Sequence, residues 1–195
     1  MDRDGSIITA IRQKDMGSLK SLFFKNDLSD VEPSFKTETE LWDYKLNCPS
    51  ISSPALEWAE ICKDILAFHN TGKGGVIFFG IDDKEYNIVG ISSENLIDSK
   101  IFNDKIRKYV GDKLWVDFYV ISNSNKTITI GAIIIPQLSD NSAIKRFQKN
   151  GPEKHKKLLF YANGSAVRRF DSSVVLSPTE ANELAFNRPV IQYKE

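Results

Sequence analysis

The chain has 195 residues, and its 26 basic and 26 acidic side chains give a formal net charge of zero. This length suits one domain with its own core, and the balanced charge is no compositional sign of nucleic-acid binding. No apolar run approaches the roughly 20 residues of a membrane span, and the N-terminus lacks the apolar segment of a signal peptide. Two cysteines and two histidines in no ligand-like spacing argue against a zinc site and favour a reducing, cytoplasmic setting.

The N-terminal part differs in pattern from the rest of the chain. Residues 6–25 carry apolar side chains at helical spacing and predict one or two short helices. Residues 26–37 are polar, contain a proline and predict a loop. We therefore expect a helical extension over residues 1–35, a single domain over residues 36–187 and a polar C-terminal tail over residues 188–195.

A short alternating segment follows this loop. Residues 39–46 predict a strand with Trp42 and Tyr44 on one face. The other face carries Asp43 and Lys45, which point the same way because they are two residues apart. A carboxylate beside a lysine suits a site that holds a metal near a phosphate, but an exposed strand face with a weak surface ion pair would show the same spacing.

The next helix has clear signals at both ends. Ser53 is a good N-cap with Pro54 at the first helical position, and residues 70–72 (Asn-Thr-Gly) predict its end. Its acidic side chains fall together on one stripe, which we interpret as a solvated face: Glu57, Glu60 and Asp64.

A glycine-rich link then leads into a buried strand that ends on two carboxylates. Residues 76–79 (Val-Ile-Phe-Phe) predict the strand, and Asp82 and Asp83 stand at its end, before a second short strand over residues 87–90. Buried strands usually end in neutral turns, so this aspartate pair is a candidate site for a metal or a phosphate-rich ligand.

The remaining segments complete an α+β pattern. The elements expected are a helix over 94–113, a hairpin of strands 115–122 and 127–136, a strand pair 158–162 and 165–169, and a helix from the Ser177 capping box to about Phe186. This order predicts a single α+β domain with a mixed, mostly antiparallel sheet flanked by helices.

Basic residues concentrate in one segment. Residues 144–157 contain a single acid, Glu153, and six cations: Lys145, Arg146, Lys149, Lys154, Lys156 and Lys157. The segment suits binding of a nucleic-acid backbone, and a solvated surface loop is the equally weighted alternative.

Three motifs together resemble a known family. Glu38-x4-Asp43-Tyr44-Lys45 is similar to a family strand E-x4-E-F-K, and residues 63–83 are similar to its A-F-A-N-T-x-G-G core and G-V-D-D turn. The third motif, Phe160-x3-Gly164-Ser165, is similar to Y-x-R-x-G-S-S. On these residues the chain resembles the Schlafen AlbA-type domain family over roughly residues 36–185.

The resemblance implies a function and a site. Some members are metal-dependent endoribonucleases that cut transfer RNA, so Glu38, Asp43 and Asp82 are expected to hold Mg²⁺ or Mn²⁺, with Lys45 steadying the phosphate. Aspartate at position 43 shortens the family's glutamate by one methylene, and Ala162 stands where the family usually has arginine. The cations expected to grip nucleic acid are the six basic residues of 144–157 together with Arg168 and Arg169. Family members with two copies of this lobe-shaped domain clamp nucleic acid between them. This chain has one copy, so the resemblance implies a homodimer.

Other functions remain open or are disfavoured. A non-catalytic DNA- or RNA-binding module, serving as regulator or sensor of a larger defence system, needs the basic segment but no metal. A protein-interaction domain would suit the zero net charge. ATP binding is disfavoured, because the chain has no G-x4-G-K-[ST] motif and its glycines precede a strand instead of a helix.

Overall fold

The computed structural model describes residues 3–139 and 142–187, so the expected C-terminal tail lies outside the described residues. Its centre is one mixed four-stranded sheet of strands β3 (Trp42–Lys45), β4 (Gly75–Phe79), β6 (Thr129–Ile135) and β5 (Asp117–Ser122), in that spatial order. Strands β3 and β4 are parallel, and the other two pairings are antiparallel. The predicted α+β class with a mixed, mostly antiparallel sheet is confirmed.

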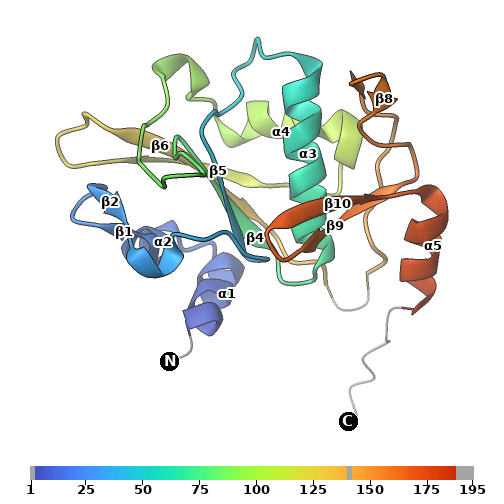
Figure 1. The fold of residues 1–195 in the computed structure, drawn as a ribbon, viewed down its shortest axis with the longest axis horizontal. Helices are drawn as coiled ribbons and strands as arrows, with labels where there is room; N and C mark the ends of the chain where they lie inside the picture. Colours follow the sequence, from blue (N-terminus) through green and yellow to red (C-terminus); the bar gives the residue numbers. More distant parts are fainter. Residues whose placement is uncertain (1–2, 140–141, 188–195) are drawn as a thin grey trace.

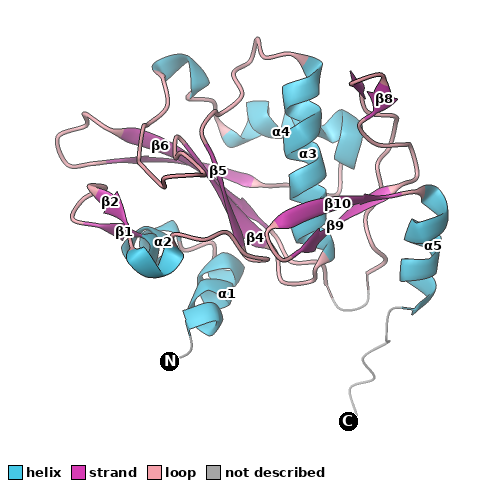
Figure 2. Ribbon diagram, in the orientation of Figure 1, coloured by secondary structure: helices cyan, strands magenta, loops and turns pink. Residues whose placement is uncertain are grey.

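Helices cover both faces of this sheet (Figures 1 and 2). Helices α3 (Ala55–Asn70) and α4 (Ser99–Val110) pack on one face, where Ile77 and Phe79 of β4 join their core. The alternate β4 residues face α1 (Arg3–Gln13) and α2 (Met16–Phe23) on the other side. The alternation of side chains along the strand therefore divides the interior into two cores.

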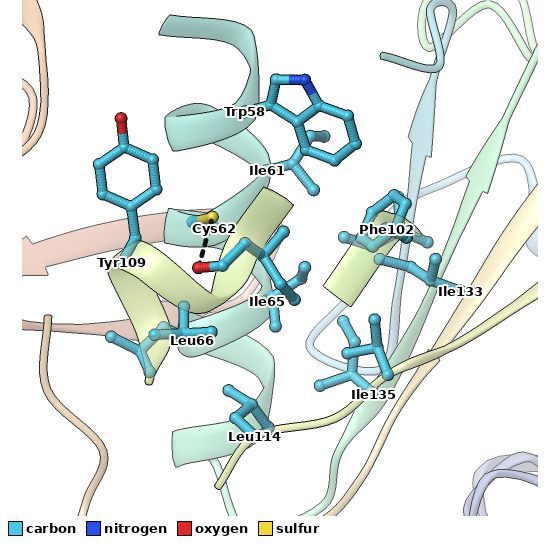
Figure 3. Packing of buried hydrophobic residues seen from close by; sticks show 14 of the residues in the cluster. Trp58, Ile61, Cys62, Ile65, Leu66, Phe102, Tyr109, Leu114, Ile133 and Ile135 are labelled. Atoms are coloured by element: carbon cyan, nitrogen blue, oxygen red, sulfur yellow. Dashed lines mark hydrogen bonds between the residues drawn. The ribbon is translucent and has the colours of Figure 1, made fainter. Parts of the chain in front are cut away.

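The core between α3 and the sheet is rich in aromatic and branched side chains (Figure 3). Trp58 of α3 meets Phe102 of α4 edge to face with ring centroids 5.2 Å apart. The Cys62 thiol lies 3.8 Å from the Ile106 carbonyl oxygen, and burial raises the pKa of this thiol. Helix α3 is thus fixed on its apolar side, which determines where its polar side chains emerge.

Glycines allow the close approach of α3 and β4. A Cβ at Gly75 would lie 2.3 Å from the Phe68 ring, so no larger residue fits there. Gly80 ends β4 with φ of +90°, in the left-handed region that favours glycine. Gly75 of the glycine-rich link therefore serves close packing, and Gly80 allows the turn that follows β4.

The N-terminal segment continues after α2 with a short hairpin and one turn of 3₁₀-helix. The hairpin pairs β1 (Phe24–Lys25) with β2 (Asp30–Val31), and the 3₁₀ turn η1 covers Pro33–Phe35. Phe23 stacks on Phe35 with ring centroids 4.2 Å apart. This segment shares its core with the central sheet.

Several predicted elements are shorter than expected. The helix expected over 94–113 consists of the 3₁₀ turn η2 (Ser93–Asn95) and α4, because Asp98 caps α4 by accepting a hydrogen bond of 2.7 Å from the Ile101 amide. The short strand after Asp83 is reduced to a single bridge between Ile81 and Ile88. Helix α3 begins at Ala55 with Pro54 as its cap residue, one position later than predicted.

The C-terminal third contains two further hairpins and a helix. Strands β7 (Glu153–Lys154) and β8 (Lys157–Leu158) form one pair, and β9 (Ser165–Arg169) and β10 (Ser172–Leu176) form the other. Helix α5 (Pro178–Asn187) follows. The predicted capping box is confirmed: the Glu180 carboxylate accepts from the Ser177 amide at 2.7 Å, and the Ser177 hydroxyl accepts from the Glu180 amide at 3.3 Å.

The predicted pairing of 158–162 with 165–169 is wrong. The Asn163-Gly164 turn bonds instead to the backbone of Phe147, through amide–carbonyl contacts of 2.9 Å in both directions. Phe160 stacks on Phe147 with ring centroids 3.7 Å apart in the α3 core. Burial of this aromatic pair takes the segment away from β9, which pairs with β10.

Candidate functional site

The alternation of β3 brings Asp43 and Lys45 to the face covered by α3. Asp43 is 1% exposed, and the Lys45 ammonium lies 2.6 Å from its Oδ2. The same ammonium lies 3.3 Å from Oδ2 of Asp64 on α3, which is also buried. The two aspartates thus share one lysine between the strand and the helix.

Arg168 approaches the same carboxylate from the β9–β10 hairpin. Its guanidinium nitrogen Nη2 lies 3.3 Å from Asp43 Oδ1, and its Nε donates to the Thr39 carbonyl oxygen at 3.2 Å. The guanidinium also stacks over the Phe68 ring at 4.6 Å from the centroid. Only 2% of the side chain is exposed. The expected nucleic-acid-binding cation at this position therefore points inward, where it joins the hairpin to β3.

Glu38 completes the cluster from the loop before β3. Its Oε1 accepts a hydrogen bond of 2.9 Å from the Tyr44 amide, and its Oε2 lies 4.0 Å from Arg168 Nη2. Burial, a hydrogen bond shared with Asp43 and the negative charge of Asp43 raise the pKa of Glu38 to about 8. We call Glu38, Asp43, Lys45, Asp64 and Arg168 the charged centre.

The charges of this centre compensate one another. Burial opposes ionisation of Asp43, but the hydrogen bond with Glu38 and the cations Lys45 and Arg168 outweigh it and lower the pKa of Asp43. Burial also opposes the charge on Lys45, yet Asp64 and Asp43 raise its pKa above the ordinary value. With Glu38 protonated, two aspartates formally balance one lysine and one arginine.

Asp82 lies in a separate turn after β4. Its Oδ1 accepts hydrogen bonds from the amides of Lys84 at 2.8 Å and Glu85 at 3.0 Å. Both hydrogen bonds lower the pKa of Asp82, and the one from the Glu85 amide has the larger effect. Among the described residues, no three carboxylate, histidine or cysteine side chains are grouped so that they could hold one metal ion. Glu38, Asp43 and Asp82 therefore do not form a ready-made metal site in this arrangement.

The main chain of the basic segment is fixed at its start by Asn70, the last residue of α3. The Asn70 side-chain amide donates to the carbonyl oxygens of Lys145 and Ala166, each at 3.0 Å, and to Ser165 Oγ at 2.9 Å. Its Oδ1 accepts from the Lys145 amide at 2.8 Å. One side chain thus joins α3, the basic segment and β9.

The cations of this segment have different environments. Arg146 donates to the carbonyl oxygens of Asn163 and Ala181, and Lys149 lies over the Tyr109 ring, 5.0 Å from its centroid. Lys154 pairs with Glu60 of α3.

The Lys145 side chain is half-buried, and the β7–β8 hairpin exposes two further cations of the segment. Lys156 and Lys157 are exposed there, and neither makes an ion pair with another residue in the described ranges. Arg169, adjacent to buried Arg168, is also exposed. The alternation of β9 separates the two arginines, sending one inward and the other outward.

The charged centre opens onto two surface hollows. The first, which we call the α3 hollow, measures about 360 Å³ and is lined by Lys45, Lys63 and Asp64 together with Glu57 and Glu60. The second, the hairpin groove, measures about 520 Å³. Its lining includes Glu38, Glu40, Arg168, Arg169, Phe170 and Asp171. Ligands in either hollow would therefore meet side chains of the same charged centre.

For two residues of this site, Asp64 and Asn70, the sequence patterns alone predict no functional role. Asp64 was assigned to a solvated stripe, although Ile61 and Phe68 flank it three and four positions away on the same helical face. An acid on an apolar stripe signals a buried partner cation, which is Lys45 here. Asn70, quoted only as part of a motif, is buried for a comparable reason, since its amide satisfies backbone groups of two other segments.

Comparisons with known proteins agree with the sequence motifs. Residues 38–175 match the family described as Schlafen, AlbA_2. The fold is similar to the crystal structure of the DIP2311 protein from Corynebacterium diphtheriae, with a TM-score of 0.53 and 14% identity. That match covers 96% of this chain and 33% of the other, so this chain spans about a third of its length. No curated protein matches the sequence.

Proposed function

Because the chain belongs to the Schlafen AlbA_2 family, we propose that it binds nucleic acid, with the α3 hollow receiving the sugar–phosphate backbone. One observation carries this proposal: cations from three separate segments surround the same hollow. Lys45 of β3 and Lys63 of α3 line it, and Lys154 reaches its Glu60 wall from the β7–β8 hairpin. Phosphate contacts of this kind position a nucleic acid without reading its sequence.

Acidic side chains of α3 limit the strength of this binding. Asp64 pairs with Lys63 at 3.4 Å, and Glu60 pairs with Lys154. A phosphate must compete with these carboxylates for the lysines, so we expect moderate affinity that falls steeply with salt.

Fluorescence anisotropy with labelled transfer RNA, single-stranded DNA and duplex DNA tests this proposal, with EDTA present to exclude cleavage. Binding should weaken as the salt concentration rises from 50 to 200 mM, because each phosphate contact with a lysine releases counterions. The double variant Lys156→Ala/Lys157→Ala should bind more weakly with a reduced salt slope. The matched control Lys113→Ala/Lys126→Ala removes two exposed lysines outside the basic segment and should bind as the wild type does. Absence of binding at low salt would overturn the proposal in favour of a protein-interaction domain.

Metal-dependent cleavage of RNA is the second candidate function, favoured by the contact of Asp43 with Lys45 and the approach of Glu38. Glu38, Asp43 and Asp82 are the carboxylates that would hold Mg²⁺ or Mn²⁺, which polarises a phosphoryl group and activates water when bound. The ion pairs of Asp43 with Lys45 and Arg168 would have to open first, and the separate turn that carries Asp82 would have to approach Glu38 and Asp43. Transfer RNA is the substrate we propose for this activity.

A cleavage assay with Mn²⁺, Mg²⁺ or EDTA separates the two candidates. Asp82→Asn keeps an oxygen for the turn amides but removes the charge, so folding should be intact while metal-dependent cutting is lost. Asp83→Asn, at the exposed neighbouring position, is the matched control and should cut normally. Cutting that persists in Asp82→Asn, after a contaminating nuclease is excluded, would contradict the assignment of this carboxylate.

We also propose that the domain acts as a homodimer and prefers RNA. A single copy offers one binding face, whereas two copies would enclose a nucleic acid. Light scattering at working concentration tests the first point, and a monomeric mass would contradict it. Equal affinities for transfer RNA and duplex DNA would contradict the second.

A further inference from the structure

The tip of the β9–β10 hairpin carries an aromatic ring that the fold does not use. Arg169 pairs with Ser172, so Phe170 and Asp171 form the turn. Phe170 is 87% exposed and has φ of +54°, a backbone conformation that favours glycine or asparagine at the first position of such a turn. A ring that stays exposed contributes little to folding stability and the positive φ opposes it, so the core does not explain phenylalanine at this position.

The ring stands beside the hairpin groove. This groove of about 520 Å³ falls in the size range of small-ligand sites. The hairpin lies across α3 in Figure 1, and the Asp43–Arg168 ion pair fixes its end to β3. The aromatic platform is therefore held in a defined position beside the charged centre.

The groove combines three kinds of recognition. Phe170 offers a π-face, exposed Arg169 offers a cation, and the carboxylates of Glu40 and Asp171 offer hydrogen-bond acceptors. Glu40 is paired with Lys73, Asp4 of the same wall is paired with Arg3, and Glu38 Oε2 lies 4.0 Å from Arg168 Nη2. The wall is thus less anionic than its count of acids implies.

We infer that the hairpin groove is a subsite for one unstacked nucleobase of a single-stranded nucleic acid, with Phe170 as its stacking platform. Every base has a π-face that stacks on an aromatic ring, and carboxylates accept from exocyclic amino groups. Arg169 would then meet the adjacent phosphate. A basic peptide would satisfy the carboxylates but would place like charge against Arg169, so the nucleobase fits better.

This inference rests on the proposed nucleic-acid binding and adds to it a selectivity for unpaired strands. Bases in a duplex are already stacked and paired, and taking one out has a cost that a single strand does not pay. The lysines around the α3 hollow make no such distinction, because phosphates are present in both forms.

Anisotropy with a labelled mixed-sequence RNA single strand, and with the same strand in a duplex, tests the subsite. Phe170→Ala should weaken single-strand binding by about 5-fold or more, as the loss of one base–aromatic stack predicts, and should change duplex binding little. Phe170→Trp should retain binding. Phe186→Ala is the matched control, since Phe186 of α5 is also 87% exposed but does not line the groove.

A second variant separates binding from folding. Asn tolerates the positive φ at position 170, so Phe170→Asn should fold at least as stably as the wild type and still bind single strands weakly. Wild-type affinity in both Phe170→Ala and Phe170→Asn would overturn the subsite while leaving the proposed function in place. Absence of nucleic-acid binding by the wild-type chain would instead overturn the proposed function itself.

Discussion

The charged centre and the basic segment contain similar side chains in opposite environments. In the centre, Asp43 and Arg168 are buried and make specific contacts that join β3 to β9. In the segment, Lys156 and Lys157 are exposed on a hairpin and make no ion pair with other described residues. The comparison indicates that the buried pair of Asp43 and Arg168 stabilises the fold, whereas Lys156 and Lys157 are available to a ligand.

Physical chemistry explains why the two regions should respond differently to mutation. Removing one member of a buried ion pair leaves its partner charged and poorly solvated, which is strongly destabilising. Removing an exposed lysine loses only weak interactions with neighbouring charges, because solvent and salt screen them. Loss of stability should therefore be larger for variants of Asp43 or Arg168 than for variants of Lys156 or Lys157. Variants of Lys156 and Lys157 should instead weaken the binding of nucleic acid.

The largest effect is expected for Arg168→Met. This change leaves Asp43 with Lys45 as its cation and breaks the link between the hairpin and β3. The free energy of unfolding should fall by about 3–5 kcal/mol, as measured by urea denaturation. Arg169→Met, at the exposed neighbouring position, should change it by less than about 0.5 kcal/mol. Similar stability of the two variants would show that the centre does not stabilise the fold.

An intermediate effect is expected from the titration of Glu38. Its pKa rises from 4.5 in the unfolded chain to about 8 in the fold, so the folded state binds the proton more tightly. This contribution to stability is complete below pH 4.5 and is lost as the pH rises through about 8.

Glu38→Gln puts a neutral side chain of similar shape in place of the protonated glutamate. The variant should therefore lack this pH dependence of stability. Between pH 5 and pH 9, the free energy of unfolding of the wild type should fall by about 1–2 kcal/mol relative to that of the variant. This figure allows for the partial exposure of the Glu38 side chain. Denaturation at several pH values measures the difference. A constant difference across this range would mean that Glu38 is ionised in the folded protein at neutral pH.

The smallest effect on stability is expected at the edge of the α3 hollow. Lys154→Ala removes the pair with Glu60, in which both side chains are partly exposed. The free energy of unfolding should change by about 0–1 kcal/mol, while affinity for nucleic acid should fall with a shallower salt dependence. A stability loss comparable to that of Arg168→Met would remove the distinction between the two regions.

Local patterns in the sequence predict the strand that carries the site. The alternation of residues 39–46 correctly separates Trp42 and Tyr44 from Asp43 and Lys45, because strand periodicity and burial of the aromatic face agree. The capping box at Ser177 is likewise a local signal that nothing in the tertiary structure opposes.

Long-range contacts decide what the sequence does not predict. Asn163-Gly164 is a strong local hairpin signal, but stacking of Phe160 on Phe147 directs that segment elsewhere. The inward direction of Arg168 depends on Asp43, which lies far away in the sequence and faces it only after β9 has docked on α3. Pairing partners of buried charges are set by such docking and cannot be obtained from spacing alone.

The amide of Asn70 has a consequence for how this molecule opens. Its bonds hold the start of the basic segment and the start of β9 to the C-terminal end of α3. Detaching either segment would leave a buried amide without its acceptors, so partial opening there is costly. Local fluctuations of the ligand-binding surface should therefore be confined to the hairpin tips, and the segments beneath them should unfold together with the helix as one cooperative unit.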